Sequence, residues 1–87
     1  MPRGYQHISD QLHRASLSIP LNIAEAAGKN SPKDKANRFT IARGSALECG
    51  AIMDSLKVLK LIDQELYSTA KQLLVRIASM LSKLCRS

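Results

Sequence analysis

Residues 11–48 read QLHRASLSIPLNIAEAAGKNSPKDKANRFTIARGSALE, and this stretch decides the fold. Its first half repeats apolar residues at alternating steps of three and four, which is the period of an amphipathic helix. A glycine, an asparagine, a serine and a proline between positions 28 and 32 then interrupt the pattern. A second helical pattern follows directly. The stretch therefore predicts two antiparallel helices joined by a short turn.

The first helix is predicted over Ser9–Ala27. Its seam at three- and four-residue spacing consists of Ile8, Leu12, Ala15, Ile19, Asn22 and Ala26. Ser9 or Asp10 is a suitable N-cap, and Gly28 suits a left-handed stop at the other end. Pro20 removes a backbone donor inside the pattern and crowds the carbonyl of Ser16, so a kink of the helix is expected there.

The second helix is predicted over Pro32–Leu59, because Ser31 is a natural N-cap and Asp34 stands where a capping acid belongs. Its seam consists of Phe39, Ala42, Ala46, Cys49, Met53 and Leu56. Gly44 and Gly50 lie inside this helix, each at a cost of about 1 kcal/mol relative to Ala. Close approach of a neighbouring helix is the expected reason for both glycines.

The third helix is predicted to begin after the N-cap Asp63 and to continue to Leu84. Its main seam consists of Leu66, Ala70, Leu73, Ile77, Met80 and Leu84, widened by Leu74, Ala78 and Leu81. No strand pattern or repeat competes with these helices. The sequence predicts one all-α domain over residues 1–87, an antiparallel bundle of three helices.

Composition limits the classes of function. Thirteen basic and seven acidic residues give a net charge of +6, which favours an acidic partner such as nucleic acid, although ordinary solubility explains the charge equally well. No signal peptide or apolar run of about 18 residues predicts a membrane segment. Cys49 and Cys85 form neither a disulfide framework nor a metal-ligand spacing, so a reducing cytoplasm fits best and Cys49 is expected in the core.

Polar residues interrupt the apolar pattern of the first two helices. Asn22 falls on the first seam, Glu25 is one turn further on, and Arg43 and Ser45 flank the second seam. A buried amide needs partners, because leaving it unsatisfied costs about 1–3 kcal/mol. The interpretation is a polar network of Asn22, Glu25, Arg43 and Ser45 that fixes the register of the helices, in preference to a ligand site.

A basic cluster surrounds the predicted turn. It consists of Lys29, Lys33, Lys35, Arg38 and Arg43, with Arg14 as an extension along the first helix. Such a cluster beside a helix N-terminus suits a nucleic-acid backbone, and a solvated helix face explains it equally well. Aromatic residues are only 3% of the chain, so base stacking would contribute little and binding would be electrostatic.

Catalytic and metal sites are not predicted. There is no Glu-x-x-His pair, phosphate loop or nucleophile elbow, and His7 and His13 do not share a helical face. No catalytic residue, metal ligand or cofactor is therefore assigned. Two alternatives stay open: a protein–protein assembly module, and a small helical enzyme that holds an anionic metabolite through Arg14, Arg43 and Glu48.

The two conspicuous blocks of the chain, QLHRASLSIPLNIAEAAG and FTIARGSALE, resemble the 23S rRNA intervening sequence (S23) family. The matching elements are Gln11-Leu12, Arg14-Ala15, Ser18-Ile19-Pro20, Asn22-Ile23-Ala24-Glu25, Ala42-Arg43-Gly44-Ser45 and Leu47-Glu48. The resemblance extends from about Tyr5 to Leu84. It implies a four-helix bundle that assembles into a ring-like homopentamer, with a basic surface for RNA or DNA and no enzymatic activity.

Two features depart from that family. Ala26 stands where the family has a glycine, and only ten residues precede Gln11, too few for the helix that family members carry there. A missing helix would leave apolar stripes exposed on its neighbours, which soluble monomers seldom tolerate. Three solutions are possible for the place of the missing helix. Another subunit fills it, the three helices pack together compactly, or the natural protein starts upstream of Met1. The first two solutions are favoured.

Overall fold

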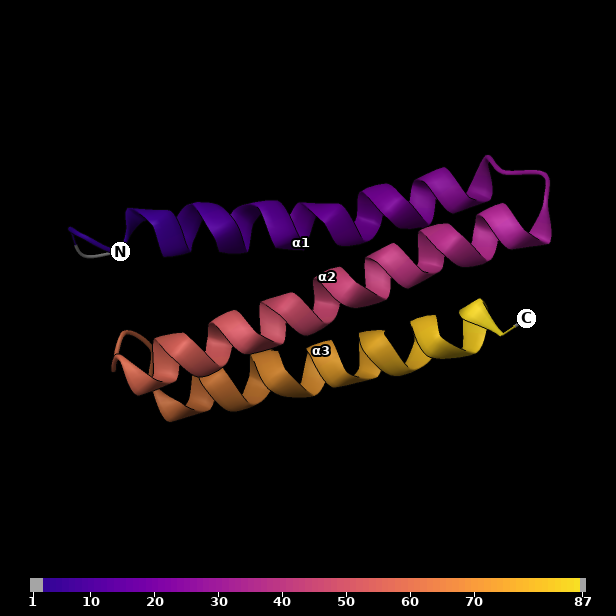
Figure 1. Cartoon of the computed structure of the whole chain (residues 1–87). Helices are drawn as coiled ribbons and strands as arrows, with labels where there is room; N and C mark the ends of the chain where they lie inside the picture. The colour runs from indigo at the N-terminus through magenta and orange to yellow at the C-terminus, as the bar shows by residue number, and fades with distance from the viewer. Residues whose placement is uncertain (1–2, 87) are drawn as a thin grey trace.

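The computed structural model describes residues 3–86, which form three antiparallel helices and contain no strand (Figure 1). They are α1 (Gln6–Ala27), α2 (Pro32–Val58) and α3 (Gln64–Cys85). The predicted all-α fold is confirmed. The first two residues and the last residue of the predicted domain lie outside the described part of the chain.

The N-terminal caps of α2 and α3 are those predicted. The Ser31 hydroxyl accepts the Asp34 N–H at 3.0 Å, and the Asp63 carboxylate accepts the Leu66 N–H at 2.7 Å. Each cap satisfies a backbone donor that has no partner within its own helix. Because a cap acts on the adjacent turn, residue type and spacing were sufficient to identify both helix starts.

The two ends of α1 differ from the prediction. The helix begins three residues early, with Tyr5 at the N-cap position and no side-chain cap, so Ser9 and Asp10 lie inside the helix. Gly28 ends it with φ of −87°, in the right-handed region, and the predicted left-handed stop is wrong. The N–H of Gly28 instead reaches the Glu25 carbonyl at 3.1 Å. The helix is continuous through Pro20.

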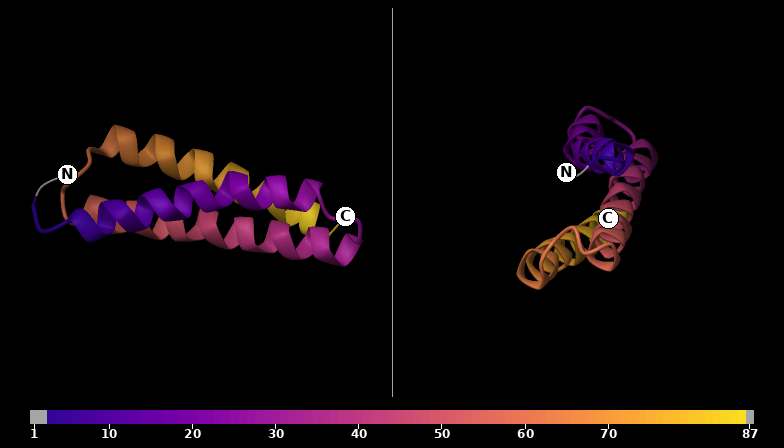
Figure 2. Two further views of the ribbon diagram at one scale, coloured as in Figure 1. Left: turned by 90° about the horizontal axis from the view of Figure 1, so that it is seen from above. Right: turned by 90° about the vertical axis from the view of Figure 1, so that its left-hand side faces the viewer.

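The three helices form a single open layer. Both α1 and α3 pack along α2, and no Cα atoms of α1 and α3 lie within 8 Å of each other. The end-on view of Figure 2 shows α1 and α3 as the two arms of a V with α2 between them. The molecule measures 44 × 22 × 13 Å, and its smallest dimension is close to the diameter of one helix. The compact three-helix arrangement is therefore not adopted.

Most of the core comes from the predicted seams of α1 and α2, of which Ile8, Leu12, Asn22 and Phe39 are only half-buried. The buried apolar residues are Ala15, Ile19, Ala26, Ala42, Ala46, Cys49, Met53, Leu56 and Leu81. Cys49 is confirmed as a core residue; burial, aided by the neighbouring Glu48 charge, raises the pKa of its thiol. The close approach expected at Gly44 is absent, since a Cβ there would have nothing within 4 Å, whereas a Cβ at Gly50 would lie 3.6 Å from Lys71 Nζ of α3.

The seam predicted for α3 packs only in part, since Ile77 lies against the core and Ala70 is half-buried. Leu81 is buried and Leu74 and Ala78 are half-buried, whereas Leu66 and Leu73 are each 52% exposed. The physical reason is the open arrangement, in which α3 contacts α2 mainly through Leu74, Ala78 and Leu81, the residues predicted to widen the seam. The other large members of the predicted seam, Met80 and Leu84, are exposed like Leu66 and Leu73.

A polar contact joins the end of α2 to the start of α3. The Asp54 carboxylate accepts the Tyr67 hydroxyl at 2.7 Å and the Lys71 ammonium at 3.0 Å. These bonds, that of Tyr67 first, lower the pKa of Asp54, and the same bond to Asp54 raises the pKa of Tyr67. The contact lies on the surface, where such pairs add little stability, but it helps to align α3 on α2.

Candidate nucleic-acid interface

The turn between α1 and α2 is short and well defined. The Lys29 N–H donates to the Ala26 carbonyl at 3.1 Å, and Ser31 then caps α2. This geometry places Lys29, Lys33 and Lys35 around one end of the molecule. Lys33 and Lys35 are exposed, whereas Lys29 lies 3.9 Å from the Glu25 carboxylate, at the limit of an ion pair. The predicted cluster at the turn is therefore brought together.

The last turn of α3 lies at the same end of the molecule, beside the first half of α2 (Figure 1). Thr40 Oγ1 and Cys85 Sγ are 3.3 Å apart, and the Arg43 guanidinium donates to the Ser82 hydroxyl at 3.3 Å. Two further cations, Lys83 and Arg86, are thereby added to the basic cluster. Sequence reasoning missed both. The antiparallel order of three helices was the signal that could have found them, since it returns the C-terminus to the α1–α2 turn.

Nearly all of the net charge lies at this end. The Ser18–Ser45 contact lies near the middle of the molecule. The half that holds the α1–α2 turn and the end of α3 contains seven cations and two anions. We call this part of the molecule the basic end; its cations are Lys29, Lys33, Lys35, Arg38, Arg43, Lys83 and Arg86, and its anions are Glu25 and Asp34. The basic end therefore holds +5 of the chain's +6 charge. The other half is close to neutral, with six cations and five anions.

The two predicted arginines on α2 face different neighbours. Arg38 is half-buried on the α1 side, where it donates to the Asn22 side-chain oxygen at 3.4 Å. Arg43 is half-buried on the α3 side, bonded to Ser82. Five residues on a helix correspond to about 140° of rotation, so the two side chains flank α2 rather than extending one row. Both side chains are partly engaged within the protein.

Arg14 does not join the basic end. It lies fifteen residues before Lys29, almost all of them in α1. At 1.5 Å per residue, the two positions are about 22 Å apart along the helix. The predicted extension of the cluster along α1 is thus not contiguous with the residues at the turn.

The polar network is real but smaller than predicted. Asn22 donates to the carbonyl and the hydroxyl of Ser18, at 2.8 and 3.0 Å, and the Ser45 hydroxyl donates to Ser18 Oγ at 2.7 Å. Together with the bond from Arg38, these contacts fix the register of α1 against α2. Ser18 and Arg38 were missing from the predicted network.

Glu25 and Arg43, the other two predicted members, lie outside it. Glu25 is exposed, three residues beyond Asn22 and thus about 60° around the helix from it, and faces Lys29. Arg43 is turned toward α3. Within the described residues, no buried side-chain polar atom lacks a partner. The network therefore presents no unsatisfied group to a ligand, in agreement with a register-setting role.

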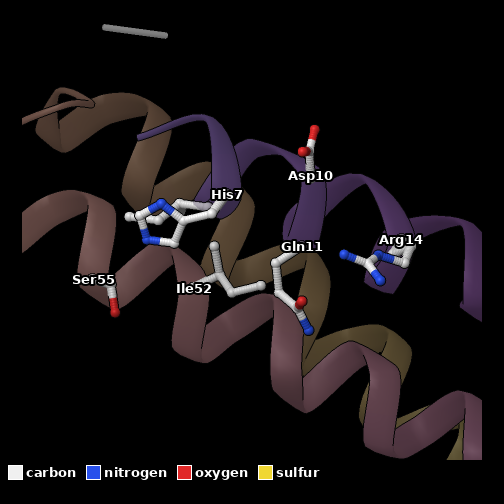
Figure 3. A pocket seen from close by; sticks show the side chains of 7 residues that line it. His7, Asp10, Gln11, Arg14, Ile52 and Ser55 are labelled. Atoms are coloured by element: carbon white, nitrogen blue, oxygen red, sulfur yellow. The ribbon is translucent and has the colours of Figure 1, made fainter. Parts of the chain in front are cut away.

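A hollow of about 360 Å³ lies at the opposite end of the molecule, between α1 and α2. Figure 3 shows Gln11 pointing toward α2, where it donates to the Glu48 carboxylate, and Asp10 pointing away. Arg14 lines the same hollow. Since Asp10 and Glu48 offset that cation, the hollow carries no positive excess for a phosphate.

The three residues suggested for an anionic metabolite do not form one site. Arg14 and Glu48 lie near the α1–α2 hollow, whereas Arg43 contacts α3 on another side of α2. A search of residues 3–86 finds no cluster of three or more ligands that would hold a metal ion. In the same residues, no helix is long and apolar enough to cross a membrane.

Comparison with known proteins identifies the family of this chain. The family model for the 23S rRNA-intervening sequence protein matches residues 4–83. A solved structure from Bacteroides thetaiotaomicron, a protein of unknown function from the S23 ribosomal protein family, superposes with a TM-score of 0.88 at 28% identity. The match covers 92% of this chain and 71% of that one. None of the curated proteins searched matched the chain. The chain belongs to the 23S rRNA-intervening sequence protein family.

Proposed function

We propose that this protein is a non-enzymatic, cytoplasmic helical protein that binds the backbone of RNA or DNA through its basic end. The observation that carries the proposal is the charge distribution: the basic end holds +5 of the net +6, contributed by both the α1–α2 turn and the end of α3. An evenly distributed charge would serve solubility equally well. Concentration at one end is what a polyanion-binding surface requires.

Side chains, rather than backbone amides, would carry this binding. At the start of α2, Pro32 has no N–H and the Asp34 N–H is taken by Ser31, so few helix N-terminal donors are available to a phosphate. The exposed Lys33 and Lys35 are the foremost contacts, and Arg86 lies across the same end. Contacts of this kind read the phosphate backbone and carry little sequence information.

The proposal predicts a steep dependence of affinity on salt. Fluorescence anisotropy with unrelated labelled oligonucleotides should show binding whose log K falls with log salt concentration at a slope between about −3 and −5, as expected for four to six phosphate contacts. Affinity should then drop roughly 100-fold or more between 50 and 200 mM salt. Absence of binding at low salt, or a slope near zero, would contradict the proposal.

An assembly module without nucleic-acid binding is the second candidate, and the open apolar face between α1 and α3 favours it. The two candidates give different results for the purified protein. A nucleic-acid-binding protein prepared at low salt should carry nucleic acid, visible in its ratio of absorbance at 260 and 280 nm. An assembly module should be free of nucleic acid and show no anisotropy change with either RNA or DNA.

A further inference from the structure

The basic end carries many cations but almost no surface on which a base could stack. Phe39 is the only Phe, Trp or Tyr within it, and this residue is half-buried on α2. The two tyrosines lie at the opposite end of the molecule, Tyr5 before α1 and Tyr67 in the first turn of α3. Proteins that hold single strands stack successive bases on aromatic rings. The basic end therefore lacks the main contact for unpaired bases.

The arginines of the basic end replace the missing rings only in part. A guanidinium plane can stack on a base when it is free to lie against it. Arg38 donates to Asn22 at 3.4 Å and Arg43 donates to Ser82 at 3.3 Å, so both groups are held against the protein. Arg86 alone of the three is exposed. The other cations are lysines, which attract a phosphate as point charges and do not recognise a base.

Four of the seven cations of the basic end are exposed, and they form two pairs. We call them the turn pair, Lys33 and Lys35, and the α3-end pair, Lys83 and Arg86. The 3.3 Å contact between Thr40 Oγ1 and Cys85 Sγ sets the last turn of α3 beside Thr40. Lys33 precedes Thr40 by seven residues, which is about 10 Å along α2. The turn pair therefore projects about 10 Å beyond the α3-end pair.

Two rows of phosphates match this arrangement better than one row. A double helix carries one negative charge per about 1.7 Å of its axis, twice the density of one strand. Its two rows face each other across a groove, which is about 12 Å wide for the major groove of B-DNA. A separation of about 10 Å lets each pair of cations contact a different row. A single strand would have to bend to meet both pairs, and ordering it costs conformational entropy that a double helix does not lose.

We propose that the ligand of the basic end is a double helix, held by its phosphate rows, rather than a single strand. The turn pair contacts one row and the α3-end pair contacts the row across the groove. This inference rests on the proposed function and names the class of nucleic acid that the basic end binds. DNA and RNA duplexes share the required chemistry, so the test includes both.

Fluorescence anisotropy with four labelled probes tests the proposal: a DNA duplex, the matching RNA duplex, and the pyrimidine strand of each, which does not pair with itself. We expect each duplex to bind at least about 10-fold more tightly than its own strand at low salt, which exceeds the twofold excess of phosphates. The slope of log K against log salt concentration should be more negative for the duplex by at least about one unit, because more counterions are released.

Two double variants separate the contributions of the two pairs. Lys83→Gln with Arg86→Gln removes the α3-end pair, and should weaken duplex binding at least about 10-fold but single-strand binding less than about threefold. The matched control, Lys33→Gln with Lys35→Gln, removes the turn pair and should weaken the binding of both ligands at least about 10-fold. All four positions are exposed, so neither variant should disturb the fold.

The outcomes distinguish this inference from the proposed function. Equal affinity for duplexes and strands, tighter binding of the strands, or equal losses of both ligands in the α3-end variant would overturn the duplex proposal and leave the proposed function standing. No binding of any probe at low salt would overturn both. A preference shown by only one of the two duplexes supports the proposal and identifies the nucleic acid.

Discussion

Exchange of Lys33 and Lys35 for glutamine is expected to weaken nucleic-acid binding by about 10- to 100-fold at 0.1 M salt and to make the salt slope less negative by about two units. Both lysines are exposed at the start of α2, so the substitutions remove phosphate contacts without opening the core. The effect should be the same for different sequences. Anisotropy titrations at several salt concentrations measure both quantities.

The matched control removes the same charge from the other end of the molecule. Lys57→Gln with Lys60→Asn reduces the net charge by two as well, and Asn suits the positive φ of 61° at position 60. This double variant should bind with an affinity within about threefold of the wild type. If both double variants weaken binding equally, binding depends on net charge alone and the basic end is not the surface.

Leu56→Ala should have the largest effect on stability, lowering the free energy of unfolding by about 2–5 kcal/mol. Leu56 is 2% exposed and is the largest fully buried side chain of the core, in which most other members are Ala or Cys. A chain of this size has only a few kcal/mol in reserve, so a substantial fraction should unfold at 25 °C. Urea denaturation followed by circular dichroism, at a fixed protein concentration, measures the change.

Val58→Ala is the matched control for that prediction. Val58 lies at the end of the same helix and is 80% exposed, so its truncation should cost less than about 0.5 kcal/mol. Comparable losses for the two variants would mean that the buried face of α2 does not support the fold as described.

The helices could be predicted from sequence because their determinants are local. Ser31 and Asp63 act on the turn that follows each of them, and the α1 and α2 seams are read from spacing alone. Gly28 shows the limit of this reasoning, since glycine permits a left-handed stop but does not require one. Gly44 shows the same limit, because the low helix propensity of a glycine does not reveal whether a neighbouring helix lies close to it.

The arrangement of the helices could not be predicted in the same way. A heptad pattern shows that a stripe is apolar but not which element covers it, so the Leu73 stripe was assigned to the core. For a similar reason, only two members of the polar network, Asn22 and Ser45, could be predicted from the sequence. Asn22 stands out on an apolar seam, whereas Ser18 is inconspicuous until α1 and α2 are set in register.

The composition of the basic end likewise needed the fold. Lys33 and Lys35 are close in sequence and can be assigned to one cluster from the sequence alone. Arg86 lies more than fifty residues away from them. Only the antiparallel order of the helices brings it to the same end. Conversely, Arg14 is nearer to the turn in sequence than Arg86 is, but the rise of α1 separates it from the turn.

The most direct test of the central claim is to map the surface that nucleic acid touches. Backbone amide shifts of the isotope-labelled protein can be followed by NMR during titration with a short oligonucleotide. We expect the largest shifts at Lys29–Arg43 and at Lys83 and Arg86, and little change at Gln6–Arg14 or Lys57–Lys71. Shifts concentrated at that second end, or no shifts at low salt, would contradict the assignment of nucleic-acid binding to the basic end.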